Sequence, residues 1–99
     1  MVTTGIFIKV ETKPETAERF ADRLKTVVDI VRAEGLARAW FGVRLGPTSF
    51  FIYDVFDDEA SRDAHLEMNG PALRAASAEL FDGDPDIQTV EVVASLLPT

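Results

Sequence analysis

The 99-residue sequence contains no cysteine and only one histidine. The absence of cysteine excludes disulfide bridges, thiolate metal ligands and a cysteine nucleophile. One histidine cannot by itself supply the several imidazoles of a typical catalytic zinc site. Since imidazole is the side chain that ordinarily titrates near neutral pH, His65 is the first candidate for a general base.

Basic residues are scarce relative to acidic ones. The chain has 10 Lys and Arg against 17 Asp and Glu, which gives a formal net charge of -7. The arginines Arg32, Arg38 and Arg44 are isolated from one another and form no basic cluster. Because an acidic surface repels phosphate groups, we expect neither nucleic acid nor an anionic membrane as a partner.

Long apolar runs are also missing. No stretch approaches the roughly 18 residues that a membrane-spanning helix requires. The first residues, MVTTGIF, lack the basic segment and cleavage pattern of a signal peptide. We therefore expect a cytoplasmic protein, and its length predicts a single domain over residues 1–99.

The common cofactor and catalytic motifs are absent. We find no GxGxxG, no P-loop, no HExxH and no GxSxG. The acidic run at residues 82–86 resembles a calcium loop, but Ile87 and Val93 occupy the positions where an EF-hand needs glycine and glutamate. We therefore predict a solvated acidic turn, and neither a metal nor a cofactor is expected.

Hydrophobic periodicity defines the first half of the chain. Residues 5–12 alternate between apolar and polar side chains, as in a strand. From Pro14 to Gly35, apolar residues recur at spacings of three and four, which predicts an amphipathic helix. Residues 37–45 and 49–56 read as two strands joined by a turn at Gly46-Pro47-Thr48.

The second half predicts a pair of helices and a last strand. We expect Asp57 to cap the first helix and Asn69-Gly70-Pro71 to separate it from a second one, which ends near Phe81. Residues 87–97 complete the pattern as a strand. This order predicts a ferredoxin-like βαββαβ fold, an α+β domain with a four-stranded antiparallel sheet and helices on one face. Since residues 49–56 are apolar on both faces apart from Asp54, we expect a second copy of the sheet to cover the other face.

Several side chains could form a ligand site. Trp40 and Arg44 share one face of their strand, and with Tyr53 they could hold a flat aromatic guest by stacking and ion pairing. Alternatively, Trp40 fills the core and Arg44 reaches solvent. A register shift of one residue decides whether Tyr53 or Asp54 shares the face of Trp40. His65 is either such a site's base or a buried structural histidine.

Three stretches resemble the antibiotic biosynthesis monooxygenase-like domains of the dimeric α+β barrel class. They are GIFIKVETKPE near the start, ARAWFGVRLGPTSFFIYDVFDDEASRDAHL in the middle, and the closing strand before LLP. The resemblance covers nearly the whole chain. It implies a homodimer whose two sheets pack face to face, with a pocket in each subunit between sheet and helices.

The resemblance also implies an activity, the oxidation of a phenolic or polycyclic aromatic by molecular oxygen without flavin, haem or metal. In that chemistry His65 is the base or a hydrogen-bond partner, while Trp40, Tyr53 and Asn69 line the pocket and Arg44 holds the substrate anion. The alternative is a non-catalytic dimeric protein that binds a small molecule or is associated with stress. Relatives that degrade haem carry an asparagine on the first strand and an iron-binding histidine near the position of Ala75, so we do not expect haem degradation.

Overall fold

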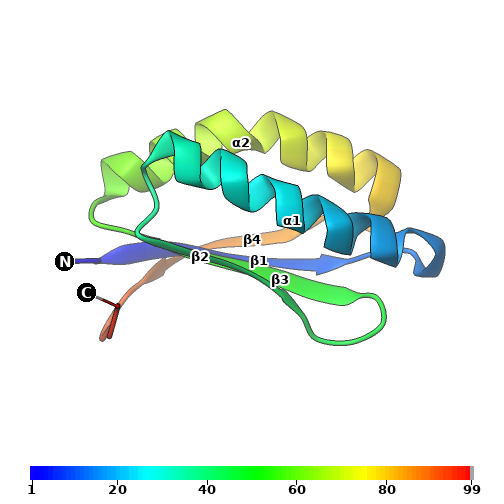
Figure 1. The fold of residues 1–99 in the computed structure, drawn as a ribbon, viewed down its shortest axis with the longest axis horizontal. Helices are drawn as coiled ribbons and strands as arrows, with labels where there is room; N and C mark the ends of the chain where they lie inside the picture. The colour runs from blue at the N-terminus through cyan, green and yellow to red at the C-terminus, as the bar shows by residue number, and fades with distance from the viewer. Residues whose placement is uncertain (99) are drawn as a thin grey trace.

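The computed structural model describes residues 1–98. In chain order its elements are β1 (Thr4–Glu11), the short 3₁₀ turn η1 (Pro14–Thr16), α1 (Ala17–Glu34), β2 (Ala39–Arg44), β3 (Ser49–Phe56), α2 (Glu59–Leu80) and β4 (Asp86–Glu91). The strands form one antiparallel sheet in the order β2-β3-β1-β4. Both helices lie on the same face of this sheet (Figure 1), which confirms the predicted ferredoxin-like fold.

The first helix follows its sequence pattern closely. Pro14 opens η1, and α1 then turns Phe20, Leu24 and Val31 toward the sheet, where they are buried. Gly35 ends the helix with φ at 72°, in the left-handed region that glycine enters without steric cost.

The second helix differs from the prediction in two respects. Asp58 caps it instead of Asp57, and the Asp58 carboxylate accepts a hydrogen bond of 2.7 Å from the Ser61 N–H. The predicted break at Asn69-Gly70-Pro71 is wrong, because α2 continues through Pro71 to Leu80. Pro71 has no N–H for the Glu67 carbonyl, but both residues are exposed, so water can take the place of the missing donor.

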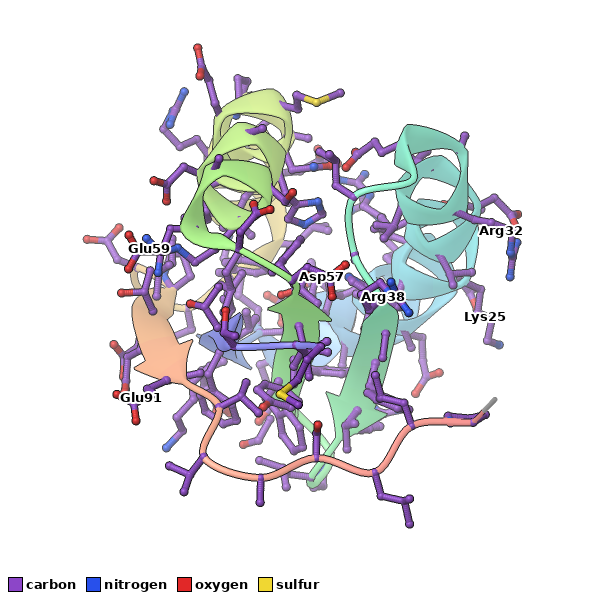
Figure 2. The ribbon with its side chains drawn as sticks, turned by 90° about the vertical axis from the view of Figure 1, so that its left-hand side faces the viewer. Lys25, Arg32, Arg38, Asp57, Glu59 and Glu91 are labelled. Carbon is purple, nitrogen blue, oxygen red and sulfur yellow. The ribbon has the colours of Figure 1, made fainter. Side chains whose placement is uncertain are left out.

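The last strand is shorter than predicted and ends at Glu91 instead of Leu97. Within residues 1–98 its one neighbour in the sheet is β1, which begins at Thr4. The last hydrogen bond between the two segments is the one that the Val92 N–H donates to the Thr3 carbonyl, at 3.0 Å. Beyond that point the chain crosses beneath the sheet, on the face opposite the helices (Figure 2).

Strand pairing determines which side chains share a face. Trp40 pairs with Asp54, and Asp54 pairs with Ile6 on the other side, so these three residues face the helices. The opposite face carries an aromatic group made of Phe7, Phe41, Phe51 and Tyr53. The ring of Phe7 lies 5.2 Å from that of Phe51 and 6.3 Å from that of Tyr53. Both faces of the sheet are therefore apolar. Among residues 1–98, no helix is long and apolar enough to span a bilayer.

Candidate functional site

At one end of the molecule, aromatic side chains pack between the helices and the sheet. Phe20 of α1 meets Phe50 of β3 and Phe81 edge to face, at centroid distances of 5.1 and 5.0 Å. The Thr16 hydroxyl donates a buried hydrogen bond of 2.6 Å to the Leu80 carbonyl. These contacts fix the start of α1 against the end of α2.

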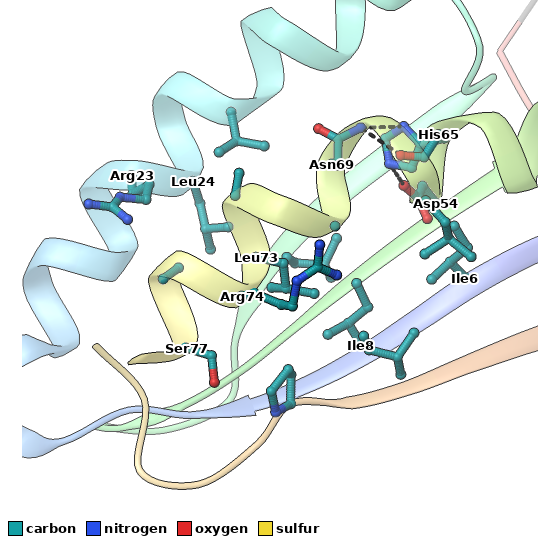
Figure 3. A pocket seen from close by; sticks show the side chains of 18 of the residues that line it. Ile6, Ile8, Arg23, Leu24, Asp54, His65, Asn69, Leu73, Arg74 and Ser77 are labelled. Carbon is teal, nitrogen blue, oxygen red and sulfur yellow. Dashed lines mark hydrogen bonds and ion pairs between the residues drawn. The ribbon is translucent and has the colours of Figure 1, made fainter. Parts of the chain in front are cut away.

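At the opposite end the helices meet through polar side chains, and a cavity of about 600 Å³ lies between them and the sheet. The sheet contributes Ile6, Ile8 and Ile52 to its lining, α1 contributes Leu24 and Val27, and α2 contributes Leu73 (Figure 3). Asp54, His65 and Asn69 also line this cavity. The arginines Arg23 and Arg74 are also among the residues that line it (Figure 3). It is therefore a largely apolar space with a few polar side chains, which is the usual composition of a small-molecule site.

His65 stands between two carboxylates. Its Nδ1 lies 2.8 Å from Glu34 Oε1 and its Nε2 lies 3.0 Å from Asp54 Oδ2. Asn69 completes the cluster, since its amide nitrogen donates to Glu34 Oε2 and to the His65 carbonyl, each at 2.9 Å. Figure 3 shows His65, Asn69 and Asp54 gathered at this end of the cavity. We call Glu34, Asp54, His65 and Asn69 the acid–base cluster.

The environment of His65 favours its charged form. Burial by itself would lower the pKa of the imidazole, since the side chain is only 8% exposed. The hydrogen bonds and negative charges of Asp54 and Glu34 outweigh burial, so the pKa of His65 is raised above its ordinary value of 6.5. The protonated ring then donates one N–H to each carboxylate.

Asp54 is the most deeply buried member of the cluster, at 2% exposure. Burial raises the pKa of its carboxyl group above the ordinary value of 3.8, and the negative charge of Glu34 acts in the same direction. The hydrogen bond and positive charge of His65 oppose that rise only in part. The second oxygen, Asp54 Oδ1, has no hydrogen-bond partner within residues 1–98.

The backbone explains how the cluster is assembled. Gly5 of β1 lies so close to β3 that a Cβ atom on it would come within 2.7 Å of the Asp54 carbonyl. Glu34 is the last residue of α1 before Gly35 turns the chain. His65 and Asn69 are four residues apart in α2 and therefore lie on the same face of that helix.

Trp40 reaches the cavity from β2, next to Asp54 in the sheet. Its position depends on Gly42, because a Cβ atom there would lie 3.2 Å from the Trp40 ring and 3.1 Å from Leu24. The structure thus brings together three of the five predicted site residues, Trp40, His65 and Asn69.

The other two predicted residues lie elsewhere. Tyr53 alternates with Asp54 along β3 and therefore points to the opposite face of the sheet, with Phe7. Arg44 shares the face of Trp40 but does not line the cavity. Its guanidinium pairs with Glu18 at 2.8 Å and donates to the carbonyls of Gly46 and Pro47 at the hairpin end. The structure therefore brings neither Arg44 nor Tyr53 to the acid–base cluster. Arg44 lines a second, smaller hollow together with Trp40, so its role toward a ligand anion stays a prediction.

Two members of the cluster were not predicted as site residues, although each has a signal in the sequence. Asp54 is the single charged residue of an otherwise apolar strand, which indicates a buried carboxylate with a specific partner. Glu34 lies in the last turn of α1, where the helix dipole disfavours negative charge. Its partner comes from α2, about 30 residues later in the chain, so local spacing could not identify the pair.

The cluster is not arranged as a metal centre. The two carboxylates lie against different ring nitrogens of His65 and so do not converge on one point. Among the residues that the structure describes, no group of three or more histidine, aspartate and glutamate side chains could hold a metal ion.

Comparisons with known proteins agree with this architecture. The sequence profile described as antibiotic biosynthesis monooxygenase matches residues 3–79. The structure of NE2512, a protein of unknown function from Nitrosomonas europaea, shares 37% sequence identity with this chain at a TM-score of 0.94, over 100% of this chain and 97% of that one.

More distant structures share the fold. One solved as an antibiotic biosynthesis monooxygenase is 20% identical at a TM-score of 0.76, over 92% of this chain and 99% of that one. PA3566 from Pseudomonas aeruginosa is 16% identical at a TM-score of 0.76, over 95% of this chain and 97% of that one. A search among functionally curated proteins gave no significant match.

Proposed function

The chain belongs to the antibiotic biosynthesis monooxygenase family, and we propose that it oxidises a phenolic or polycyclic aromatic molecule with molecular oxygen. The observation that supports this most directly is the position of the acid–base cluster at one end of an apolar cavity of about 600 Å³. Flat aromatic rings suit the aliphatic lining, and the cluster supplies the one reactive group that the chemistry needs, a proton acceptor.

The proposed reaction needs no flavin, haem or metal, because the substrate supplies the electrons. For an anthrone, the cluster removes a proton and leaves an electron-rich anion. The ring carbon of this anion forms a bond to molecular oxygen. When the second hydrogen of that carbon leaves as a proton and the O–O bond breaks, the products are a carbonyl group and water. The CH₂ group loses four electrons and the oxygen molecule gains four, so the step is balanced.

The protein's contributions are positioning and proton transfer. Trp40 offers an aromatic surface beside the cluster, and Asn69 holds Glu34 and the α2 backbone in place. The apolar lining excludes water, which strengthens the electrostatic effect of the cluster on a developing anion. The raised pKa of Asp54 also brings that carboxyl group closer to the working range of a general base.

We also propose that the protein works as a homodimer. The aromatic group on the sheet face away from the helices includes Phe41, which is 55% exposed. The segment after β4 adds Val93 and Leu96, at 88% and 97% exposure. So much apolar surface on one side of a small chain favours a partner, and a second copy can offer a matching sheet.

Oxygen uptake tests the proposed activity. We expect wild-type protein to accelerate oxygen consumption by at least one member of a panel of anthrones and quinols. The His65→Ala variant should lose at least about 100-fold of that rate, the usual share of a general acid–base group. The exposed substitution Met68→Ala on the same helix is the matched control and should keep the full rate.

The outcome also separates the alternative function. A protein that binds these aromatics but consumes no oxygen, in wild type and variants alike, would be a non-catalytic binding protein. Equal rates for wild type and His65→Ala would remove His65 from the mechanism.

A further inference from the structure

We propose that Asp54, not His65, is the residue that contacts the substrate, and that its Oδ1 accepts the hydrogen of a phenol or enol O–H group. His65 is then a positioning residue. The reaction rests on the proposed function, but the contact does not. Binding alone can show whether Asp54 Oδ1 meets the ligand and whether it selects ligands with a hydroxyl group.

His65 has no free ring nitrogen. Nδ1 lies 2.8 Å from Glu34 Oε1, and Nε2 lies 3.0 Å from Asp54 Oδ2. When the ring is protonated, both nitrogens donate to carboxylates and neither keeps a lone pair. His65 could take a proton from a ligand only after giving up one of these two contacts, each of which is buried.

Asp54 has the opposite character. Its Oδ2 is engaged with His65, but Oδ1 is buried and has no partner among the described residues. An ionised carboxylate can only accept hydrogen bonds, and a buried acceptor without a donor is unfavourable. Since Asp54 also lines the cavity, a bound molecule can supply that donor once a small side-chain movement opens Oδ1 to it.

The charges select the form of the ligand. Two carboxylates face one imidazolium, and Arg44, the cation that the sequence offered for an anion, is bound to Glu18 and the hairpin end. An anionic group such as a carboxylate is therefore disfavoured beside Asp54. A neutral hydroxyl group is favoured there, and the mainly apolar lining favours an apolar ring system for the rest of the molecule. Arg23 and Arg74, which also line the cavity, can accept polar substituents elsewhere on that ring system. The group that meets Asp54 is thus an uncharged hydroxyl on an aromatic ligand.

The proton then has a short path. The O–H bond of the ligand breaks, the proton moves to Asp54 Oδ1, and the electron pair remains on the ligand oxygen. The carboxyl group becomes neutral, while the His65 imidazolium stays in place to offset the new anion. Glu34 and Asn69 keep the imidazolium oriented. No other reactant is consumed in this transfer.

A matched pair of probes tests the contact by equilibrium binding. 2-Naphthol and 2-methoxynaphthalene have the same rings, but only the first can donate a hydrogen bond. We expect wild-type protein to bind 2-naphthol at least about tenfold more tightly, the preference that one buried hydrogen bond confers. In Asp54→Asn, the amide oxygen must accept the His65 Nε2–H, which leaves an NH₂ donor in place of Oδ1. The preference should then disappear, whereas the control Asp22→Asn, an exposed carboxylate on α1, should keep it.

A measurement on unaltered protein covers the case in which Asp54→Asn does not fold. His65 is the only histidine, so its ring protons give one unambiguous set of NMR signals. A hydrogen bond donated to Asp54 Oδ1 weakens the hydrogen bond between Asp54 Oδ2 and His65 Nε2. 2-Naphthol should therefore shift the His65 signals more than 2-methoxynaphthalene does. Equal shifts with both probes would overturn the inference, as would an unchanged preference in a folded Asp54→Asn variant.

The two proposals can fail separately. If wild type oxidises none of the anthrones and quinols but prefers 2-naphthol through Asp54, the oxygenase assignment fails and the contact stands. If oxidation occurs and the hydroxyl preference is absent or independent of Asp54, the contact is wrong and the oxygenase assignment stands.

Discussion

The charge of His65 connects the candidate site to the stability of the fold. The imidazole is buried between Asp54 and Glu34, and their hydrogen bonds and charges raise its pKa above 6.5 despite the opposing effect of burial. A group whose pKa is raised by folding binds its proton more tightly in the folded state. Protonation of His65 therefore favours folding.

We predict that stability falls as the pH rises from neutral to alkaline. The stabilisation by His65 is complete below pH 6.5, its unfolded pKa, and is lost as the pH passes through the raised folded pKa. The raised pKa of Asp54 has the same sign, but its effect begins in the acidic range, because that stabilisation is complete only below the ordinary pKa of 3.8 and is lost as the pH rises through the raised folded pKa. Urea unfolding at a series of pH values measures the effect.

The variant His65→Gln isolates the contribution of the imidazole. It should be less stable than wild type at pH 6, and the difference should shrink as the pH rises above 6.5. A difference that grows with pH would mean that His65 is neutral in the folded protein. An NMR titration of the single histidine would then give a pKa below 6.5.

Sequence reasoning could predict individual site residues only where one local pattern defined the environment. His65 stood out as the sole imidazole, and Trp40 as a large ring on a face that strand alternation defines. Glu34 could not be paired with His65, because that contact depends on how the end of α1 approaches the start of α2. Tyr53 lies on the opposite face because the strand register, which the sequence left open, puts Asp54 beside Trp40.

At the level of elements, α1 and α2 show why one helix was predicted correctly and the other was not. The stripe of α1 ends at a glycine with positive φ, so pattern and backbone agree. In α2 the local breaker Pro71 is overridden by tertiary contacts on both sides. His65 precedes it in the acid–base cluster, and Ala76 and Leu80 follow it in the buried core. Packing of these two ends on the same sheet holds the helix continuous.

We predict that Pro71→Ala stabilises the protein. Proline in a helix interior destabilises a protein by about 3 kcal/mol relative to alanine. Proline also restricts the unfolded chain, and this stabilisation offsets up to about 1 kcal/mol of that cost. Because Pro71 is exposed, alanine can restore the N–H without leaving a cavity. A gain of about 2–3 kcal/mol in the free energy of unfolding is therefore expected from urea denaturation.

Pro47 provides the matched control, since it is equally exposed but lies in the turn between β2 and β3. Pro47→Ala should be neutral or slightly destabilising, because proline suits a turn and limits the unfolded chain. A loss of stability in Pro71→Ala would contradict a continuous α2 and support two helices separated at this position.

At the scale of the whole molecule, the sheet has two apolar faces and only one layer of helices. The sequence predicted this imbalance from the composition of residues 49–56, and the structure confirms it in Phe7, Phe41, Phe51 and Tyr53. A chain of 99 residues buries a smaller share of its surface than a larger domain does, so a partly exposed aromatic face is a considerable cost to it. A second copy related by two-fold symmetry can cover this face, because the same aromatic residues of both copies then bury one another.

We therefore predict a dimer at micromolar concentration by gel filtration with light scattering. Phe41→Glu, which places a charge on the aromatic sheet face, should shift the protein toward the monomer by at least about 2 kcal/mol of association free energy. Met68→Glu adds the same charge at a residue that is 60% exposed on α2, compared with 55% for Phe41 on the sheet, and should leave the dimer intact. A monomeric wild type would contradict the barrel, whereas dissociation by both variants would place the contact on the helices. If only Phe41→Glu dissociates the dimer, the aromatic sheet face is the interface, and each acid–base cluster lies on the helix side of the sheet, away from the contact.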